Sequence, residues 1–208
     1  MTADPKHFVL RTTLTSPFGR KVRIAAEVLG LNSHITLAPA DPLDENDTLR
    51  AQNPLGKMPC LITTDGTVIY DSGVIIEFLQ NMTGGEKLLP AGGLARFKAL
   101  TLARLADGIT EAALLVVYET RFRDLGTQSD RWLAHQRGKI TRALDAFEVS
   151  PPDPTNTAIV AIGLACALGY LDWRKGVDWR PTHPRLVAWF AAFAKNESAF
   201  ERTRAPNS

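Results

Sequence analysis

The first seventy residues alternate between short β-prone runs and segments with helical spacing of apolar residues. Residues 7–11 read HFVLR, a β-prone run, and apolar side chains then recur at helical spacing from Val22 to Leu29. Ser16 before Pro17 is typical of a helix start. Serine caps free N–H groups, and proline at the first helical position costs no hydrogen bond, because an N–H there has no partner within the helix. Gly30 is a typical residue for the end of a helix. The pattern predicts a strand followed by a helix.

The next segment repeats this alternation and ends in a hairpin and a helix. Residues 33–38 allow a second strand, and residues 44–52 indicate a short polar helix. Residues 59–63 and 68–70 are β-prone and flank an Asp65-Gly66 dipeptide, which is a strong hairpin signal. Asp71 and Ser72 then precede an apolar stripe at helical spacing. The predicted order is βαβαββα.

Strand signals largely cease after a connector rich in glycine and proline. We therefore predict a βαβαββα domain at residues 1–84, a linker at 85–93 and an all-helical domain at 94–208. Apolar periodicity indicates helices over residues 97–117, 132–147, 158–171 and 186–193, the second of them capped by Ser129. The predicted fold class is α/β plus all-α.

Composition narrows the classes of function. The 208 residues are 45% hydrophobic and 22% charged, an ordinary globular mixture. The net charge is +2 and the 24 basic residues are dispersed, which argues against nucleic-acid binding. Cys60 and Cys166 stand alone, so we expect two buried, reduced thiols and neither a disulfide scaffold nor a metal site. The N-terminus lacks a signal-peptide pattern and the longest apolar run is short for a membrane span, so a cytoplasmic location is expected.

Three motifs occur in this order, spread over the first half of the chain. They are Thr15-Ser16-Pro17-Phe18, the run Asn53-Pro54-Leu55-Gly56-Lys57-Met58-Pro59, and Tyr70-Asp71-Ser72. With these motifs and the order of its elements, the chain resembles the glutathione transferase superfamily, in particular its bacterial serine-type members. The resemblance implies a thioredoxin-like domain that binds glutathione, a helical bundle domain for a second substrate, and a detoxifying homodimer.

The resemblance gives Ser16 the catalytic role. Glutathione reacts as its thiolate, yet an ordinary thiol has a pKa of about 8.5 and is mostly protonated at neutral pH. The start of a helix offers free N–H groups and partial positive charge, and a hydroxyl there can donate to sulfur. Thr13 and Thr15 are competing hydroxyl donors, and Ser16 as a purely structural cap is the further alternative.

The other two motifs imply contacts along the tripeptide. A cis bond between Met58 and Pro59 would aim the Met58 backbone at the cysteinyl part of glutathione. Ser72 would bind the γ-glutamyl carboxylate at a helix start and Asp71 its ammonium group. Lys57 could lie near the glycyl carboxylate, although a solvated lysine on a turn is the more common case.

The resemblance also implies a pocket for the second substrate. Its expected residues are Leu14, Phe18, Ile109, Tyr118, Arg121 and Phe122, for which ordinary core packing is an equal alternative. Tyr118 and Arg121 could polarise a leaving group. In some relatives an acidic residue at the place of Asp107 reaches the partner subunit's glutathione, and a solvated helix residue is the alternative.

The predicted function is glutathione transfer to a small apolar electrophile, with glutathione as co-substrate and no metal. A glutathione-dependent reductase or peroxidase of the same fold is disfavoured, because no cysteine occupies the active helix start. A non-catalytic glutathione-binding module is the second alternative, since a fold does not fix a function.

Overall fold

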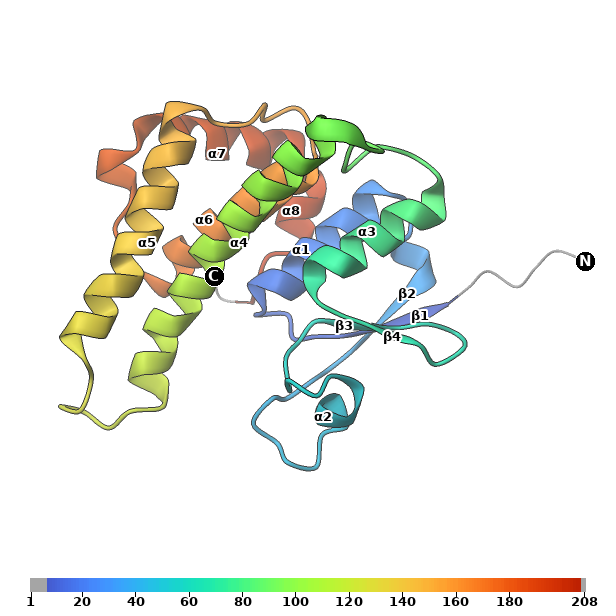
Figure 1. Ribbon diagram of the computed structural model, residues 1–208, viewed down its shortest axis with the longest axis horizontal. Coiled ribbons are helices and arrows are strands. Elements are labelled where there is room, and N and C mark those ends of the chain that lie inside the picture. The colour runs from blue at the N-terminus through green and yellow to red at the C-terminus, as the bar shows by residue number, and fades with distance from the viewer. Residues whose placement is uncertain (1–6, 207–208) are drawn as a thin grey trace, which may run out of the picture. The chain divides into compact units, whose positions relative to one another are not determined.

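The computed structural model describes residues 7–206, which form two compact units (Figure 1). The first unit contains the chain up to Ala91 together with the chain from Ala199 onward, and the second is Gly92–Ser198. The outer limits of the predicted domains, residues 1 and 208, lie outside the described residues. The sequence interpretation assigns residues 94–208 to one helical domain, whereas contacts join the end of the chain to the first unit.

The first unit is built on a four-stranded sheet. Its strands are β1 (Phe8–Arg11), β2 (Ile35–Ala38), β3 (Cys60–Ile62) and β4 (Val68–Ile69), in the order β2-β1-β3-β4. β1 pairs with β2 in parallel, and β3 is antiparallel to both β1 and β4. With α1 (Pro17–Val28), α2 (Leu49–Gln52) and α3 (Ser72–Thr83), this arrangement confirms the predicted order βαβαββα. A short 3-10 helix, η1 (Asn32–His34), precedes β2.

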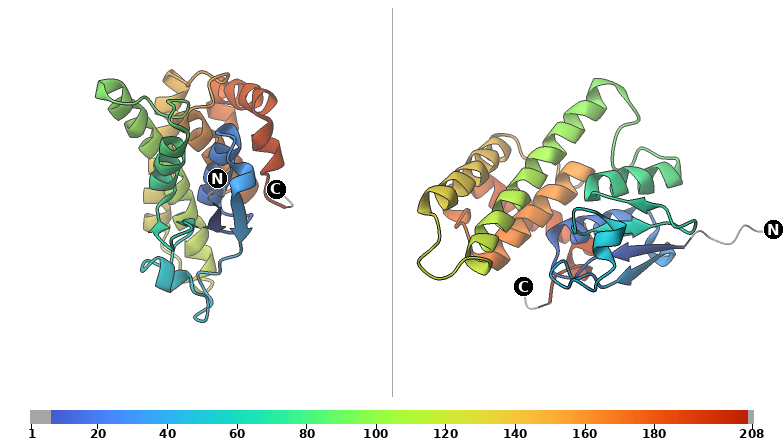
Figure 2. Two further views of the ribbon diagram at one scale, coloured as in Figure 1. Left: turned by 90° about the vertical axis from the view of Figure 1, so that its right-hand side faces the viewer. Right: turned by 60° about the horizontal axis from the view of Figure 1, so that its bottom comes forward.

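α1 and α3 pack together on one face of the sheet, and α2 lies on the other (Figures 1 and 2). The start of α1 lies close to the loop after β1, and Gly19 permits this close approach. A Cβ added at Gly19 would overlap Oγ1 of the buried Thr12. The absence of a side chain at Gly19 therefore lets the loop after β1 lie against the first turn of α1.

The Asp65-Gly66 turn joins β3 and β4 as the sequence predicts. Thr63 donates its backbone N–H to the Thr67 carbonyl, and Gly66 has a φ of 84° that favours glycine. The Asp65 carboxylate accepts hydrogen bonds from the Thr63 hydroxyl and the Thr67 N–H, which lower its pKa to about 2. The same carboxylate therefore favours the turn while it is ionised.

α8 (Ser198–Arg202) and the residues after it are anchored on α1. The buried Arg20 side chain donates to the Phe200 carbonyl at 2.6 Å and stacks 3.9 Å from the Phe200 ring. Arg202 forms an ion pair of 2.7 Å with Glu27. Burial of a guanidinium removes its water, and contacts with a carbonyl oxygen and an aromatic ring compensate for that loss. These contacts therefore fix the end of the chain on the first unit.

The second unit is helical. It contains α4 (Gly93–Arg121), α5 (Asp130–Val149), α6 (Ile159–Arg174), the 3-10 helix η2 (Arg180–Thr182) and α7 (Pro184–Asn196). α6 confirms the helix predicted at residues 158–171; it packs on α4, and every residue from Ile159 to Leu168 is buried. Ser129 caps α5 by accepting from the Trp132 N–H. In α6 the corresponding cap position, Ala158, makes no such bond.

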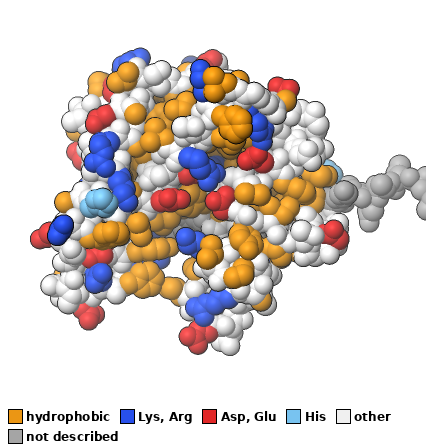
Figure 3. Space-filling view, in the orientation of Figure 1, with side chains coloured by type: hydrophobic (Ala, Val, Ile, Leu, Met, Phe, Trp, Pro, Cys, Tyr) orange, Lys and Arg blue, Asp and Glu red, His pale blue; other side chains and the backbone are white. Residues whose placement is uncertain are grey.

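Acidic, basic and hydrophobic side chains are mixed over the face drawn in Figure 3. None of the helices within residues 7–206 is long and apolar enough to cross a membrane.

Gly19→Ala is expected to lower the free energy of unfolding by about 1–3 kcal/mol, the usual cost of overpacking, because the new methyl group meets Thr12. Gly85→Ala is the matched control, since a Cβ there meets nothing within 4 Å. Urea unfolding followed by circular dichroism measures both. Equal stability of the two variants would show that Gly19 is not required for close approach.

Candidate functional site

The sheet topology brings the three sequence motifs to one edge. β1 and β3 are antiparallel, and Arg11 at the end of β1 pairs with Cys60 at the start of β3. The loop after β1 and the loop before β3 therefore lie side by side. β4 is antiparallel to β3, so the residues that follow β4 return to the same edge. Ser16, Met58 and Ser72 thus come from three loops at one edge of the sheet.

Ser16 is the N-cap of α1, as the sequence predicts. Its Oγ accepts a hydrogen bond of 3.1 Å from the Gly19 N–H. The residue is half-buried. Because the cap uses a lone pair of the oxygen, the hydroxyl proton is still available to donate to a ligand. The structural-cap alternative and the functional role are therefore compatible for the same side chain.

The competing hydroxyls of Thr13 and Thr15 lie 3.1 Å from each other. The Thr13 N–H donates to Sδ of Met58 at 3.2 Å, which joins the two loops directly. Thr15 is exposed and Thr13 is half-buried. The two threonine hydroxyls can bond to each other, whereas Ser16 interacts with the helix N-terminus, where the partial positive charge lies.

The Met58–Pro59 peptide bond is cis, which agrees with the family resemblance. Within the described part of the chain, neither the N–H nor the C=O of Met58 makes a backbone hydrogen bond. A backbone donor and acceptor without protein partners can pair with an extended peptide as an added strand would. Met58 thus offers its backbone to a ligand, while its side chain contacts the Thr13 loop.

The turn before Met58 is held by Asn53. This buried side chain donates to the Lys57 carbonyl at 2.8 Å, and the Cys60 thiol donates to the same carbonyl at 3.3 Å. The Lys57 side chain is exposed. Cys60 is a buried thiol whose pKa is raised by burial, and Cys166 is also buried; among the described residues neither cysteine forms a disulfide. Both cysteines are therefore as the sequence predicts.

Asp71 and Ser72 form the start of α3. Asp71 is the N-cap, and its Oδ1 accepts from the N–H groups of Gly73 at 2.9 Å and Val74 at 3.4 Å. Ser72 is only 3% exposed, and within residues 7–206 its hydroxyl makes no hydrogen bond. A nearly buried hydroxyl without a protein partner at a helix start is suited to a ligand carboxylate.

Arg11 is a residue that the sequence analysis missed. Its guanidinium donates to Asp47 at 2.5 Å, Thr48 at 2.7 Å and the Pro39 carbonyl at 3.1 Å. Backbone N–H groups of Asp41 and Leu49 lower the pKa of Asp47, and Arg11 adds to this effect. Arg11 thereby ties the segment that leads into α2 to the end of β1. The available signal was an arginine at the end of a β-prone run, followed by an acidic segment.

The predicted residues of the second-substrate pocket are distributed over both units. Leu14 is 47% exposed and Phe18 is half-buried in the first unit. In the second unit, the rings of Tyr118 and Phe122 lie 5.3 Å apart and Arg121 lies 5.8 Å from the Tyr118 ring. Ile109 has no exposed surface. The structure thus brings Tyr118, Arg121 and Phe122 together at the end of α4.

Asp107 is not a solvated helix residue, so that alternative is wrong. It is 4% exposed, and Arg104 lies 3.0 Å from its carboxylate.

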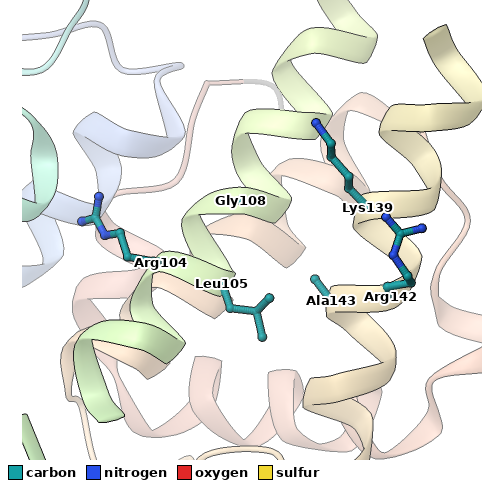
Figure 4. A pocket seen from close by; sticks show the side chains of 6 residues that line it. All are labelled: Arg104, Leu105, Gly108, Lys139, Arg142 and Ala143. Atoms are coloured by element: carbon teal, nitrogen blue, oxygen red, sulfur yellow. The ribbon is translucent and has the colours of Figure 1, made fainter. Parts of the chain in front are cut away.

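Figure 4 shows a shallow opening between α4 and α5, close to this pair, with a volume of about 330 Å³. It is lined by Arg104, Leu105, Gly108, Lys139, Arg142 and Ala143. Of the three basic residues in this lining, Arg104 pairs with Asp107 and Lys139 donates to Gln136. None of the predicted site residues lines the opening.

Comparison with known proteins identifies the family. Residues 15–82 match the family described as glutathione S-transferase, N-terminal domain. The GST-like protein YibF of Escherichia coli K12, itself uncharacterised, is 37% identical over 203 residues, covering 93% of this chain and 96% of that protein. The chain belongs to the glutathione transferase superfamily.

Solved structures agree. A glutathione transferase family member from Pseudomonas fluorescens with bound glutathione is 38% identical, with a TM-score of 0.89 over 96% of this chain and 99% of that one. A second structure from P. fluorescens, with bound S-(propanoic acid)-glutathione, has a TM-score of 0.85 at 38% identity and covers 96% of this chain and 100% of that one. These similarities confirm the predicted fold class.

Arg11→Gln is expected to loosen the segment from Asp41 to Gln52, because the ion pair with Asp47 is lost together with hydrogen bonds to Pro39, Thr48 and Gln52. We expect a loss of about 1–3 kcal/mol, since bonds to charged groups contribute most. Hydrogen exchange of the α2 amides measures the local effect. Arg50→Gln is the control, because among the described residues that exposed arginine makes only one long bond, of 3.4 Å, to Pro42. Unchanged α2 exchange in Arg11→Gln would contradict the anchoring role.

Proposed function

We propose that this protein is a glutathione transferase whose Ser16 hydroxyl stabilises the glutathione thiolate for attack on a small electrophile. The single observation that carries the proposal is the double capacity of Ser16. Its oxygen accepts from the Gly19 N–H and its proton is available to donate, both at the first turn of α1. The P. fluorescens relative, whose structures hold glutathione and S-(propanoic acid)-glutathione, supports this proposal.

The proposed reaction requires that the protein stabilise the thiolate anion of glutathione. In the proposed reaction the sulfur bonds to an electrophilic carbon, and either a leaving group departs with its electron pair or the carbon skeleton takes up a proton. A hydrogen bond to sulfur and the partial positive charge of the helix start both favour the thiolate over the thiol. Ser16 and the free N–H groups of α1 supply these two effects without a metal.

Glutathione would lie as an extended chain along the edge formed by the three loops. The Met58 backbone would pair with the cysteinyl residue, because its N–H and C=O make no backbone bond in the described residues. Ser72 would receive the γ-glutamyl carboxylate at the start of α3, and Asp71 its ammonium group. The exposed Lys57 is the proposed partner of the glycyl carboxylate.

Of the residues expected to contact the second substrate, Tyr118, Arg121 and Phe122 lie together at the end of α4, and the roles of Leu14 and Phe18 stay predictions. Apart from the charge of Arg121 and the phenol of Tyr118, these side chains offer apolar surface. The P. fluorescens protein binds a glutathione derivative substituted with propanoic acid, and that structure supports conjugation as the reaction class here. Ile109, which has no exposed surface, would need to move to take part.

Two other functions for this fold are less well supported. A reductase or peroxidase would need a reactive thiol, whereas Cys60 is buried with a raised pKa. A non-catalytic binding module would bind glutathione without turnover, which a panel of electrophiles tests. A cytoplasmic location, a homodimer, a role in detoxification and a reach of Asp107 across that dimer stay predictions.

Ser16→Ala should raise the pKa of bound glutathione by about 1–2 units, since a hydrogen bond to a charged group contributes about 1.5–3 kcal/mol. Affinity should change little. The thiolate absorbance of the complex, followed against pH, measures this pKa. Ser16→Thr keeps both cap and donor and should restore the wild-type curve. A normal curve in Ser16→Ala, with a shifted one in Thr13→Ala or Thr15→Ala, would move the role to that threonine.

Ser72→Ala should weaken glutathione binding about tenfold, because a hydrogen bond to the ligand carboxylate is lost. The pKa of the bound thiol should stay at its wild-type value. Isothermal titration gives the affinity, and Ser16→Ala is the matched comparison because it is expected to change the pKa instead. Equal affinity of Ser72→Ala and wild type would place the carboxylate elsewhere.

A further inference from the structure

Two arginines and four aromatic rings gather within the second unit, in the last turns of α4 and α6. α4 contributes Tyr118, Arg121 and Phe122, and α6 contributes Tyr170, Trp173 and Arg174. Each set has the spacing i, i+3, i+4, which places three side chains on one face of a helix. We call these six residues the α4–α6 arginine cluster.

Arg174 lies against aromatic faces. Its guanidinium carbon is 3.8 Å from the centre of the Trp173 ring and 5.6 Å from that of Tyr170. Its Nε has almost no accessible surface and no hydrogen-bond partner in the described residues. A guanidinium carries five N–H donors, so the terminal nitrogens of Arg174 can donate to a carboxylate while its Nε stays buried.

The two helix ends lie close together. A Cβ added at Gly176, just after α6, would lie 3.5 Å from Cγ1 of Val116 in α4. Burial raises the pKa of the Tyr170 phenol; Arg174 opposes that shift, and Tyr118 and Arg121 also act on it. The charges of α4 therefore reach the phenol of α6.

The carboxylates on the same helix turns have other partners. Glu119 accepts from the Ser129 N–H at 2.8 Å and pairs with Arg123 at 2.9 Å. Asp172 pairs with Arg180 at 2.6 Å and accepts from the Trp179 indole at 2.9 Å. Within residues 7–206, neither Arg121 nor Arg174 forms an ion pair.

A simpler explanation is that both arginines stabilise the helix ends. Cations near a helix C-terminus gain about 0.3–1 kcal/mol from the helix dipole. That effect explains why basic residues stand in the last turns. It does not require that two helix ends that each carry an arginine and a tyrosine lie close together. Two arginines without carboxylates, next to phenol donors and flat apolar rings, match the needs of an aromatic or unsaturated acid.

We propose that the α4–α6 arginine cluster binds the carboxylate of a small organic acid and that the second substrate of this enzyme belongs to this class. Arg121 and Arg174 pair with the carboxylate, and the rings of Tyr118 and Trp173 contact the apolar body of the acid. The inference rests on the proposed function, because it names the chemical class of the electrophile. The carboxylate site itself lies wholly within α4 and α6.

Equilibrium binding tests the cluster without any reaction. The full chain, free of glutathione, is titrated calorimetrically with 3-phenylpropanoate and with its neutral isostere 3-phenylpropanamide. The acid should bind at least about tenfold more tightly than the amide, the effect of one hydrogen bond between charged groups. This comparison on the unaltered protein needs no variant and is independent of folding defects.

Variants then assign the preference to the two arginines. Arg121→Gln and Arg174→Gln should each reduce the acid's affinity about tenfold, towards that of the amide. Arg137→Gln is the matched control, because Arg137 is an exposed arginine of α5 whose side chain makes no ion pair in the described chain. It should keep the full preference for the acid.

Equal binding of acid and amide by the wild type would overturn the inference, as would a preference that survives both substitutions. A separate glutathione titration distinguishes this failure from failure of the proposed function. Preference for the acid without glutathione binding would support the carboxylate site and contradict the transferase. Glutathione binding without any acid preference would overturn the carboxylate site alone.

Discussion

The hydroxyl group of Ser16 carries two tasks, and the proposed chemistry depends on their compatibility. A helix start has N–H groups that need acceptors, and a thiolate needs a donor. A hydroxyl accepts through its lone pairs and donates through its proton, so one serine satisfies both needs. Gly19 makes this geometry possible, because its missing side chain lets Thr12 and the loop after β1 lie against the first turn of α1.

The rest of the candidate site follows from strand direction. An antiparallel β1–β3–β4 arrangement delivers three chain segments to one sheet edge, although they are separated by up to 56 residues in the sequence, from Ser16 to Ser72. Two of these segments retain polar groups without protein partners in the described residues, the backbone of Met58 and the hydroxyl of Ser72. Such groups can pair with a ligand that brings its own donors and acceptors, so their presence at one edge argues for a polar, peptide-like ligand.

Local chemistry made much of the fold predictable. The cap at Ser16, the Asp65-Gly66 turn and the start of α3 each depend on neighbouring residues, and all are present in the structure. The return of the chain end to the first unit was not predictable, because the burial of Arg20 against Phe200 joins residues 180 positions apart. The Arg11 anchor and the α6 residues of the α4–α6 arginine cluster were not predicted, for the same reason. Their partners are set by tertiary packing, which one sequence does not reveal.

A crystal structure with glutathione bound tests the central claim most directly. We predict the tripeptide extended across the edge formed by the loops at Ser16, Met58 and Ser72, with its sulfur within hydrogen-bonding distance of the Ser16 hydroxyl, about 3.0–3.5 Å. A sulfur placed at Thr13 or Thr15, or a tripeptide bound away from this edge, would contradict the account.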